Sequence, residues 1–282
     1  MSHKTLIVDA GGTSTDWCMT DVAGNVIAQL QTEAVNMTVS ARGVSDAIAD
    51  AGALVKNAAR IYYYGAGCVT PDQCGFVRTE FLRFAQNGVV VEVHGDMLGV
   101  ARGLLGNRAG VACILGTGAN TCLYDGEKIV GSIRPLGYIL GDEGSGAALG
   151  KRFLKQLLRG GLHQSVSDIF YTETGATYYD IIENVYRGDK PNKYLGSFAR
   201  FIHRHLDMPG MEDIVYDEFN SFCENFLVKY PDAQSCVCCG SIAYHFETQL
   251  KQVASRYGVT IDGIAASPVP GLIKYHLRHS LS

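Results

Sequence analysis

Hydrophobic and polar positions near the start of the chain follow the period-two pattern of β-strands. An apolar run at 6–9 ends in an aspartate, a strand-like alternation covers 14–20, and a second alternation covers 26–32 after a turn at 21–25. Alternation bounded by turn residues predicts strands, so this stretch predicts a hairpin whose Gly-rich loop occupies residues 11–14. In the common dinucleotide and P-loop motifs such glycines lead directly into a helix, which this pattern does not predict.

Strand-like and helix-like segments then alternate. Apolar residues recur at helical spacing over 44–55, a short apolar strand follows at 61–65, and another apolar strand at 89–93 leads through Asp96 into a helix rich in small residues. This alternation predicts an α/β fold. From about 145 to 235 the spacing is mostly helical, which predicts a helical insertion.

The glycine-looped hairpin occurs twice in the chain. Residues 111–133 again contain an apolar run, a Gly-Thr-Gly loop, a strand, an Asp-Gly turn and another strand, and Cys122 follows Cys18 by 104 residues. A repeat at this distance predicts two related domains, and two such loops facing each other across a cleft would hold a polyphosphate from both sides. The residues 107–110 are the predicted seam, with a first domain at 1–106 and a second at 107–267.

Composition narrows the class of protein. The 282 residues are 47% apolar, enough for the cores of two domains, and the net charge of −4 gives no reason to expect nucleic acid or a membrane surface as a partner. No apolar stretch reaches the length of a membrane span, and no leader peptide is apparent, so a soluble protein is expected.

Nine cysteines, several of them in apolar runs, argue against a disulfide framework and favour the cytoplasm. The run Cys-Val-Cys-Cys at 236–239 suggests metal binding, but adjacent cysteines in a strand point to opposite faces, so core packing is the favoured interpretation.

Two carboxylates stand where chemistry is expected. Asp9 ends the first strand, where it could hold Mg²⁺ through water, and Asp96 follows an apolar strand at the top of the predicted sheet. An ionised carboxylate there could accept the proton of a hydroxyl that attacks a phosphate. The simpler alternatives are a plain Gly-rich turn for 11–14 and helix N-capping for Asp96.

Three motifs together resemble one superfamily. Residues 9–16 resemble the first phosphate motif of the actin-like, sugar-kinase and Hsp70 ATPases, 115–120 the second, and 240–246 the adenosine motif, although Cys239 replaces a common second glycine. Within it, the chain is most similar to the group of N-acetylglucosamine kinases and BadF/BadG/BcrA/BcrD-type ATPases, because Gly-Asp-Glu-Gly-Ser at 141–145 resembles their signature.

The resemblance implies an α/β fold of two ribonuclease H-like domains with a central cleft, a helical insertion in the second domain, and a C-terminal helix at 268–282 that joins the first domain. It implies ATP and Mg²⁺ as cofactors and an amino sugar, most of all N-acetylglucosamine, as the substrate that a kinase phosphorylates, with Asp96 as general base and Asp9 near the metal. The ATP-binding residues implied are Gly11, Gly12, Thr13, Ser14, Gly116, Thr117, Gly118, Gly240 and Ser241. The sugar-binding residues implied are Asn36, Asp96, Gly137 and Asp142.

One departure and two alternatives stay open. The family often has Gly-Gly-Trp before Gly137, but this chain has Arg134, Pro135 and Leu136. Arg134 could pair with a carboxylate such as that of N-acetylmuramic acid, although a surface salt bridge is the favoured interpretation. An ATPase activator of a 2-hydroxyacyl-CoA dehydratase would need an iron–sulfur cluster at a dimer interface, with a cysteine just before the second loop, whereas Cys113 lies one step further back. A non-catalytic sugar- or nucleotide-sensing regulator is the other alternative, and a homodimer is left open.

Overall fold

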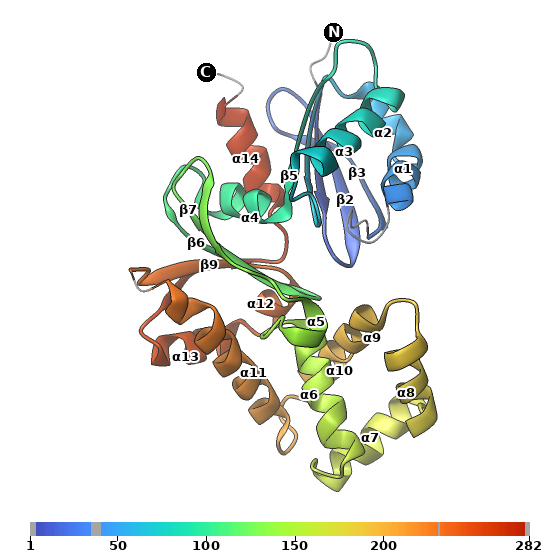
Figure 1. Ribbon diagram of the computed structural model, residues 1–282, viewed down its shortest axis with the longest axis vertical. Coiled ribbons are helices and arrows are strands. Elements are labelled where there is room, and N and C mark those ends of the chain that lie inside the picture. Colours follow the sequence, from blue (N-terminus) through green and yellow to red (C-terminus); the bar gives the residue numbers. More distant parts are fainter. Residues whose placement is uncertain (1–3, 35–40, 231, 280–282) are drawn as a thin grey trace. The chain divides into compact units, whose positions relative to one another are not determined.

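The computed structural model describes residues 4–34, 41–230 and 232–279. It contains two five-stranded sheets with helices packed against them (Figure 1). The chain divides into two compact units, of which the first comprises Met1–Ala112, Tyr124–Val130 and Ser267–Ser282, and the second Cys113–Leu123 and Gly131–Ala266. No helix in the described part of the chain combines the length and the apolar character that a membrane span requires.

The first sheet has the strand order β3-β2-β1-β4-β5. Its strands are β1 (Thr5–Ala10), β2 (Ser14–Thr20), β3 (Val26–Glu33), β4 (Arg60–Gly65) and β5 (Val90–Gly95). The strands β1, β2 and β3 pair antiparallel, whereas β4 pairs parallel with both β1 and β5. The glycine loop therefore joins two antiparallel strands, as the period-two pattern predicted.

Helices cover both faces of this sheet. They are α1 (Ala41–Asp50), α2 (Gly52–Asn57) and α3 (Pro71–Phe84) on one face, and α4 (Asp96–Leu105) and α14 (Val269–His279) on the other. The helix α3 begins at Pro71 because the side chain of Thr70 accepts a hydrogen bond from the Gln73 N–H, at 3.3 Å, and forms a capping box.

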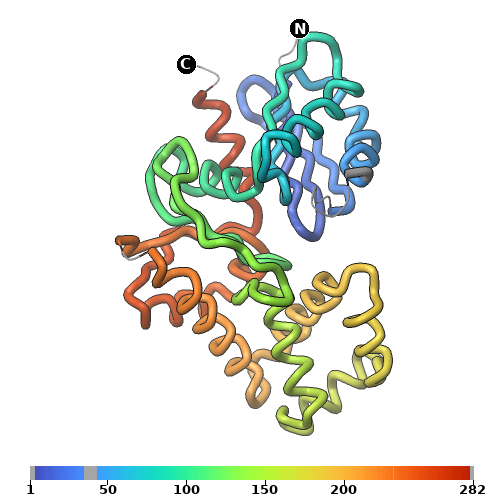
Figure 2. The backbone as a smooth tube through the Cα atoms, in the orientation of Figure 1, coloured from blue at the N-terminus to red at the C-terminus, as the bar shows by residue number. Residues whose placement is uncertain are grey.

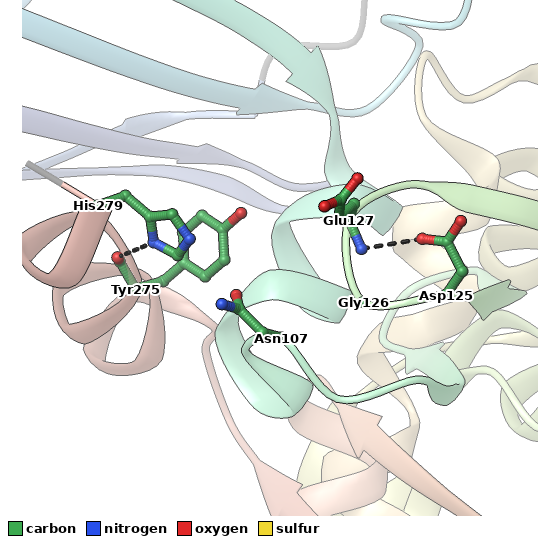
Figure 3. Close-up of a pocket in the computed structure, with 6 residues that line it drawn as sticks. All are labelled: Asn107, Asp125, Gly126, Glu127, Tyr275 and His279. Carbon is green, nitrogen blue, oxygen red and sulfur yellow. Dashed lines mark hydrogen bonds between the residues drawn. The ribbon is translucent and has the colours of Figure 1, made fainter. Parts of the chain in front are cut away.

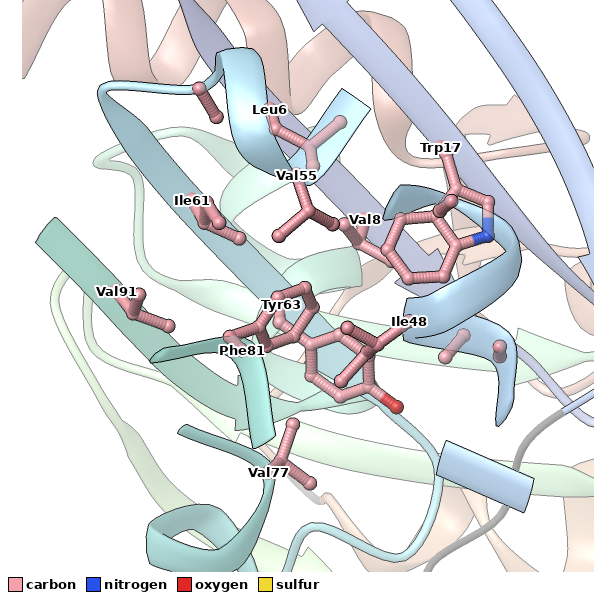
Figure 4. Packing of buried hydrophobic residues seen from close by; sticks show 14 of the residues in the cluster. Leu6, Val8, Trp17, Ile48, Val55, Ile61, Tyr63, Val77, Phe81 and Val91 are labelled. Atoms are coloured by element: carbon pink, nitrogen blue, oxygen red, sulfur yellow. The ribbon is translucent and has the colours of Figure 1, made fainter. Parts of the chain in front are cut away.

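The core of the first unit lies mainly beneath α1, α2 and α3. Trp17 packs edge to face against Phe81, which also meets the Tyr63 ring (Figure 4). On the opposite face, Ile7 packs with Leu272 of α14. Because β1 is buried on both faces, its sequence is a continuous apolar run rather than an alternation.

The second sheet repeats the topology of the first. Its order is β8-β7-β6-β9-β10. When the five strands of each sheet are counted along the chain, both sheets have the order third, second, first, fourth, fifth. The strands are β6 (Gly110–Leu115), β7 (Ala119–Tyr124), β8 (Ile129–Ile133), β9 (Ser235–Cys239) and β10 (Thr260–Ala265). The sequence repeat thus corresponds to two copies of one fold, and the predicted α/β class with two related sheets is confirmed.

The predicted helical insertion lies between β8 and β9, and Figure 2 shows it running from green to orange. Its helices are α5 (Gly137–Leu140), α6 (Gly146–Leu158), α7 (Gln164–Thr174), α8 (Tyr178–Arg187), α9 (Pro191–Ser197), α10 (Ala199–Arg204) and α11 (Met211–Asn225), followed by a 3-10 turn at Leu227–Lys229. Phe153, Phe170 and Phe201 form its aromatic core, with ring centroids 5.3 to 5.4 Å apart. The helices α12 (Ser241–His245) and α13 (Glu247–Arg256) connect β9 to β10.

Candidate active site

The glycine loop of the first unit is a tight connection between β1 and β2. The Gly11 N–H donates a hydrogen bond to the Ser14 carbonyl, at 3.0 Å, and Gly12 and Thr13 at the tip are exposed. Asp9 lies opposite Asp16 in the strand register, so one carboxylate stands on each side of the loop. Such a loop presents backbone N–H groups to an anion.

The strand register brings Asp96 to the same sheet edge as this loop. Ala10 is aligned with Gly65, and Gly65 with Gly95, so the carboxyl ends of β1, β4 and β5 lie level. Gly11 follows directly after Ala10, and Asp96 directly after Gly95. The edge where parallel strands end is where α/β proteins place their ligands.

Asp96 is the first residue of α4, and Gly95 occupies the N-cap position without a side-chain hydrogen bond. One carboxylate oxygen of Asp96, Oδ1, accepts a hydrogen bond from the Met97 N–H at 2.9 Å. Asp96 therefore lies within the first turn of the helix rather than at its cap. Its own backbone N–H also donates to the carboxylate.

Burial raises the pKa of both Asp9 and Asp96 at this edge. Burial raises the pKa of Asp9 to about 7, and the charges of Asp96 and Asp16 contribute to this increase. Burial also raises the pKa of Asp96, although hydrogen bonds from the backbone N–H groups of Met97 and Asp96 partly oppose it. Half-buried carboxylates that repel each other favour a cation nearby, so the donor set fits a hydrated Mg²⁺ at Asp9.

A buried hydroxyl lies near these carboxylates. Burial, followed by the charges of Cys68, Asp96 and Asp9, raises the pKa of Tyr63, whose hydroxyl has no hydrogen-bond partner in the described part of the chain. The Tyr63 ring covers Gly65, where any Cβ would overlap it. The glycine at the end of β4 is therefore required by packing.

The glycine loop of the second unit is held by the start of α6. The Gly146 N–H donates to the Gly116 carbonyl at 2.8 Å, and the Ala147 N–H donates to the Thr117 carbonyl at 3.1 Å. Within the loop, the Gly116 N–H donates to the Gly118 carbonyl at 3.0 Å. Two loop carbonyls are thus engaged by a helix N-terminus, which fixes the backbone of a loop expected to contact phosphate.

Asp142 packs directly on this loop. A Cβ on Gly118 would lie 3.0 Å from Oδ2 of Asp142, and Asp142 has a left-handed backbone with φ of 61°, which is uncommon outside glycine. Burial raises the pKa of Asp142, while a hydrogen bond from the Ala119 N–H opposes the increase. The N-cap of α6 is Ser145, whose side chain accepts from the Ala148 N–H at 3.1 Å. Asp142 is therefore not needed as a cap.

One buried residue that fixes this turn was missed in the sequence. Glu218, on α11, accepts a hydrogen bond from the Gly144 N–H at 3.2 Å and another from Nε of Arg152 at 2.7 Å. Its side chain is only 6% exposed. The sequence offered one indication of this role: Glu218 is an acidic residue beside Val215 and Phe219 on the apolar face of a predicted helix.

Gly240 lies at the end of β9 and approaches the same loop. Its φ is 115°, and a Cβ there would lie 2.5 Å from the Leu115 carbonyl oxygen, so only glycine fits. Ser241 begins α12 and is exposed, and Gly137, with φ of 74°, begins α5. The loop at 116–118, Gly240 and Asp142 therefore share one region of the second unit.

The predicted residues fall into two groups, one in each unit. Asp9, the loop at 11–14 and Asp96 lie at one edge of the first sheet. In the second unit, Asp142 and Gly240 lie against the loop at 116–118, and Gly137 begins α5. Asn36 lies outside the described residues, and Arg134 is exposed between β8 and α5.

A cavity of about 390 Å³ lies elsewhere in the first unit and is lined by Asn107, Asp125, Gly126, Glu127, Tyr275 and His279 (Figure 3). Its floor is the turn after β7, where the Glu127 N–H donates to Asp125 at 2.9 Å. This turn is at the opposite end of β7 from the loop at 116–118. None of the residues that line the cavity is a predicted site residue.

No protein-family model and no curated protein matches the chain. A solved structure described as a putative N-acetylglucosamine kinase from Porphyromonas gingivalis matches it with 38% identity and a TM-score of 0.91, over 98% of this chain and 99% of that one. The chain belongs to the same family as this protein. The family assignment rests on this similarity over the whole length.

More distant structures show the fold of the family. A putative N-acetylglucosamine kinase from Chromobacterium violaceum has 17% identity and a TM-score of 0.74, over 97% of this chain and 99% of its own. A ROK family glucokinase from Streptomyces griseus, in complex with glucose and AMPPNP, has 17% identity and a TM-score of 0.57, over 96% and 97%. The two-sheet fold is thus that of the actin-like sugar kinases, and the finer resemblance to BadF/BadG/BcrA/BcrD-type ATPases stays a prediction.

Proposed function

We propose that the chain is an ATP-dependent sugar kinase that phosphorylates an amino sugar, with N-acetylglucosamine as the first candidate. The observation that carries this proposal is the strand register that brings Asp96 to the same sheet edge as Asp9 and the loop at 11–14. A base, a metal-holding carboxylate and a phosphate loop are what transfer of a phosphoryl group to a hydroxyl requires. Membership in the family of the Porphyromonas gingivalis protein supports the same activity.

Asp96 would accept the proton of the attacking hydroxyl at its carboxylate. Burial raises its pKa, which brings the carboxylate closer to the optimum for a base at neutral pH, while the Met97 N–H keeps its orientation. Asp9 would hold Mg²⁺ through water; when bound, this ion neutralises charge on the phosphate oxygens.

The second unit would contribute a phosphate loop and a sugar contact. Gly116, Thr117 and Gly118 would present N–H groups to phosphate from a backbone that α6 already holds in place. Asp142 would accept hydrogen bonds from sugar hydroxyls, since its carboxylate borders Gly118. Gly240 would let the end of β9 pack directly on the backbone of Leu115 and Gly116, next to this loop.

The buried position of Cys113 argues against the dehydratase-activator alternative. Cys113 is 0% exposed within β6, and Ile114 and Leu115 separate it from the loop. A cluster shared between two subunits needs cysteines at the surface of each.

The test is ADP release at fixed Mg·ATP against N-acetylglucosamine, N-acetylmuramic acid, glucosamine, glucose, N-acetylmannosamine and a blank without sugar. Asp96→Asn should lower the sugar-dependent rate by about 10² to 10⁴, the usual contribution of a general base. Asp21→Asn is the control, because Asp21 lies in the exposed turn between β2 and β3 and binds only the backbone and side chain of that turn. A flat response to every sugar would contradict the proposal, and ATP turnover without an acceptor, or none at all, would favour a regulator or an activator.

A further inference from the structure

Three buried thiols converge in the second sheet. Cys113 lies on β6, and Cys236 and Cys238 lie on the neighbouring strand β9. Their sulfur atoms all lie within 4.8 Å of one another, with Sγ of Cys236 and Sγ of Cys238 4.0 Å apart. Residues two apart in a strand point to the same face, which explains why Cys236 and Cys238 meet Cys113 while Cys239, between strand and loop, points away.

The spacing suits a thiolate-bound metal ion. A zinc–sulfur bond is about 2.3 Å, which places the sulfurs of a tetrahedral site about 3.8 Å apart. The observed separations exceed this value by no more than about an ångström, a distance that small side-chain rotations can close. Among the described residues, these three cysteines are the group of three or more His, Cys, Asp or Glu residues whose ligand atoms all lie this close together. Packing of thiols as small apolar groups does not require three sulfurs to meet at one point.

Burial favours a soft divalent cation. Cys113, Cys236 and Cys238 are all buried in the second unit. Cysteine binds a metal ion as the thiolate, and a thiolate buried without a cation is costly. A soft divalent ion offsets two such charges, while monovalent Cu⁺ offsets one.

A fourth sulfur lies nearby on another element of the second unit. Cys223, on α11, is fully buried and interacts electrostatically with Cys236 and Cys238. It lies outside the set of three whose sulfurs converge. Because structural zinc sites have four ligands, Cys223 is the nearby candidate for a fourth.

We propose that Cys113, Cys236 and Cys238 form a binding site for one thiophilic divalent cation of the Zn²⁺ class. On binding, each coordinating sulfur exchanges its S–H bond for a sulfur–metal bond, and the protons pass to solvent. A bound ion would link β6 to β9 close to the loop at 116–118 and to Gly240, because the loop follows β6 and Gly240 follows β9. The site does not depend on the proposed kinase activity.

Titration of the metal-free, reduced full chain with Cd²⁺ tests the site, because Cd²⁺–thiolate bonds absorb in the near ultraviolet. We expect saturation at one ion per chain, release of protons, and a rise in the unfolding temperature. Cys113→Ser and Cys236→Ser should weaken binding by at least the 10- to 100-fold that loss of an outer-shell partner costs. The matched control Cys239→Ser removes a thiol of the same strand from the other face and should bind Cd²⁺ as the wild type does.

The proposal is overturned if the wild type shows no thiolate absorption, or if Cys113→Ser and Cys239→Ser bind Cd²⁺ equally well. If a variant does not fold, the Cd²⁺ titration of the wild type alone still tests the site, because absence of thiolate absorption overturns the proposal. Alkylation of the chain in partial denaturant, followed by mass spectrometry, should show that Cd²⁺ protects Cys113, Cys236 and Cys238 together. Equal labelling of these three with and without the ion would likewise rule out the site.

Discussion

Gly118 and Asp142 are in van der Waals contact, so that a Cβ on Gly118 would lie 3.0 Å from Oδ2 of Asp142. This contact links the loop expected to bind phosphate with the carboxylate expected to bind sugar. Because Asp142 is held by the Ala119 N–H and by a left-handed backbone, it has little room to move away.

Gly118→Ala should therefore lower kcat/KM for the sugar about tenfold or more, since displacement of a positioned group by a fraction of an ångström already costs rate. The measurement is steady-state kinetics with the sugar and ATP varied separately. Gly116→Ala is the informative comparison, because a Cβ there meets no atom within 4 Å. An equal loss in both variants would show that a methyl group disturbs the ligand and not Asp142.

The free energy of unfolding of the first unit should fall as the pH rises, because the buried carboxyl group of Asp9 loses its proton. Its pKa is raised to about 7 from an unfolded value near 4, so between these values the unfolded chain gives up a proton that the folded chain keeps. The stabilisation from protonated Asp9 is complete below pH 4 and is lost as the pH rises through 7, by at most about 4 kcal/mol.

Asp9→Asn should accordingly unfold at a higher urea concentration than the wild type at pH 8, with little difference at pH 4. Trp17 is the single tryptophan and is buried in the first unit, so its fluorescence follows this unit alone. A difference between the proteins that does not change with pH would contradict the raised pKa. Mg²⁺ should reduce the difference if it binds beside Asp9.

Glu218→Ala should destabilise the second unit by about 2 kcal/mol or more, because it removes the acceptor of the Gly144 N–H and the buried partner of Arg152. Thermal unfolding followed by circular dichroism measures the change. Asp217→Ala is the matched control: Asp217 lies 3.5 Å from the same guanidinium, but its side chain is 57% exposed. An exposed ion pair contributes little, so this variant should unfold as the wild type does.

Arg134→Ala should change the choice between sugars. If Arg134 pairs with a sugar carboxylate, turnover of N-acetylmuramic acid should fall about tenfold relative to N-acetylglucosamine, and Arg134→Lys should recover only part of it because lysine lacks the planar fork. Competition between the two sugars at equal concentration gives the ratio directly. An unchanged ratio in Arg134→Ala would remove Arg134 from the sugar site.

Local patterns made much of the fold predictable. An apolar run followed by a period-two alternation predicted the hairpin of β1 and β2, and the recurrence of Cys18 as Cys122 predicted two copies of one sheet. Asp96 could be placed at a strand end because it directly follows an apolar run. Each of these features is visible either within one short segment or as a repeat of such a segment.

Contacts between distant residues could not be predicted in the same way. Glu218 and Gly144 are 74 positions apart, and no periodicity connects them. The meeting of Cys113 with Cys236 and Cys238 depends on β6 lying beside β9, which follows from the strand order and not from either segment. The left-handed backbone of Asp142 is set by the turn that packs it on Gly118, so residue type alone gave no indication of it.

The position of the helical insertion sets the order in which the two sheets can fold. In the first sheet, β1 and β4 are neighbours with residues 11–59 between them, whereas in the second sheet residues 116–234 separate the neighbours β6 and β9. Closing a longer segment costs more chain entropy, and non-local pairs form slowly. The helices around Phe153 can form first and shorten this segment. During refolding, Trp17 should therefore regain its native fluorescence before the second sheet is complete.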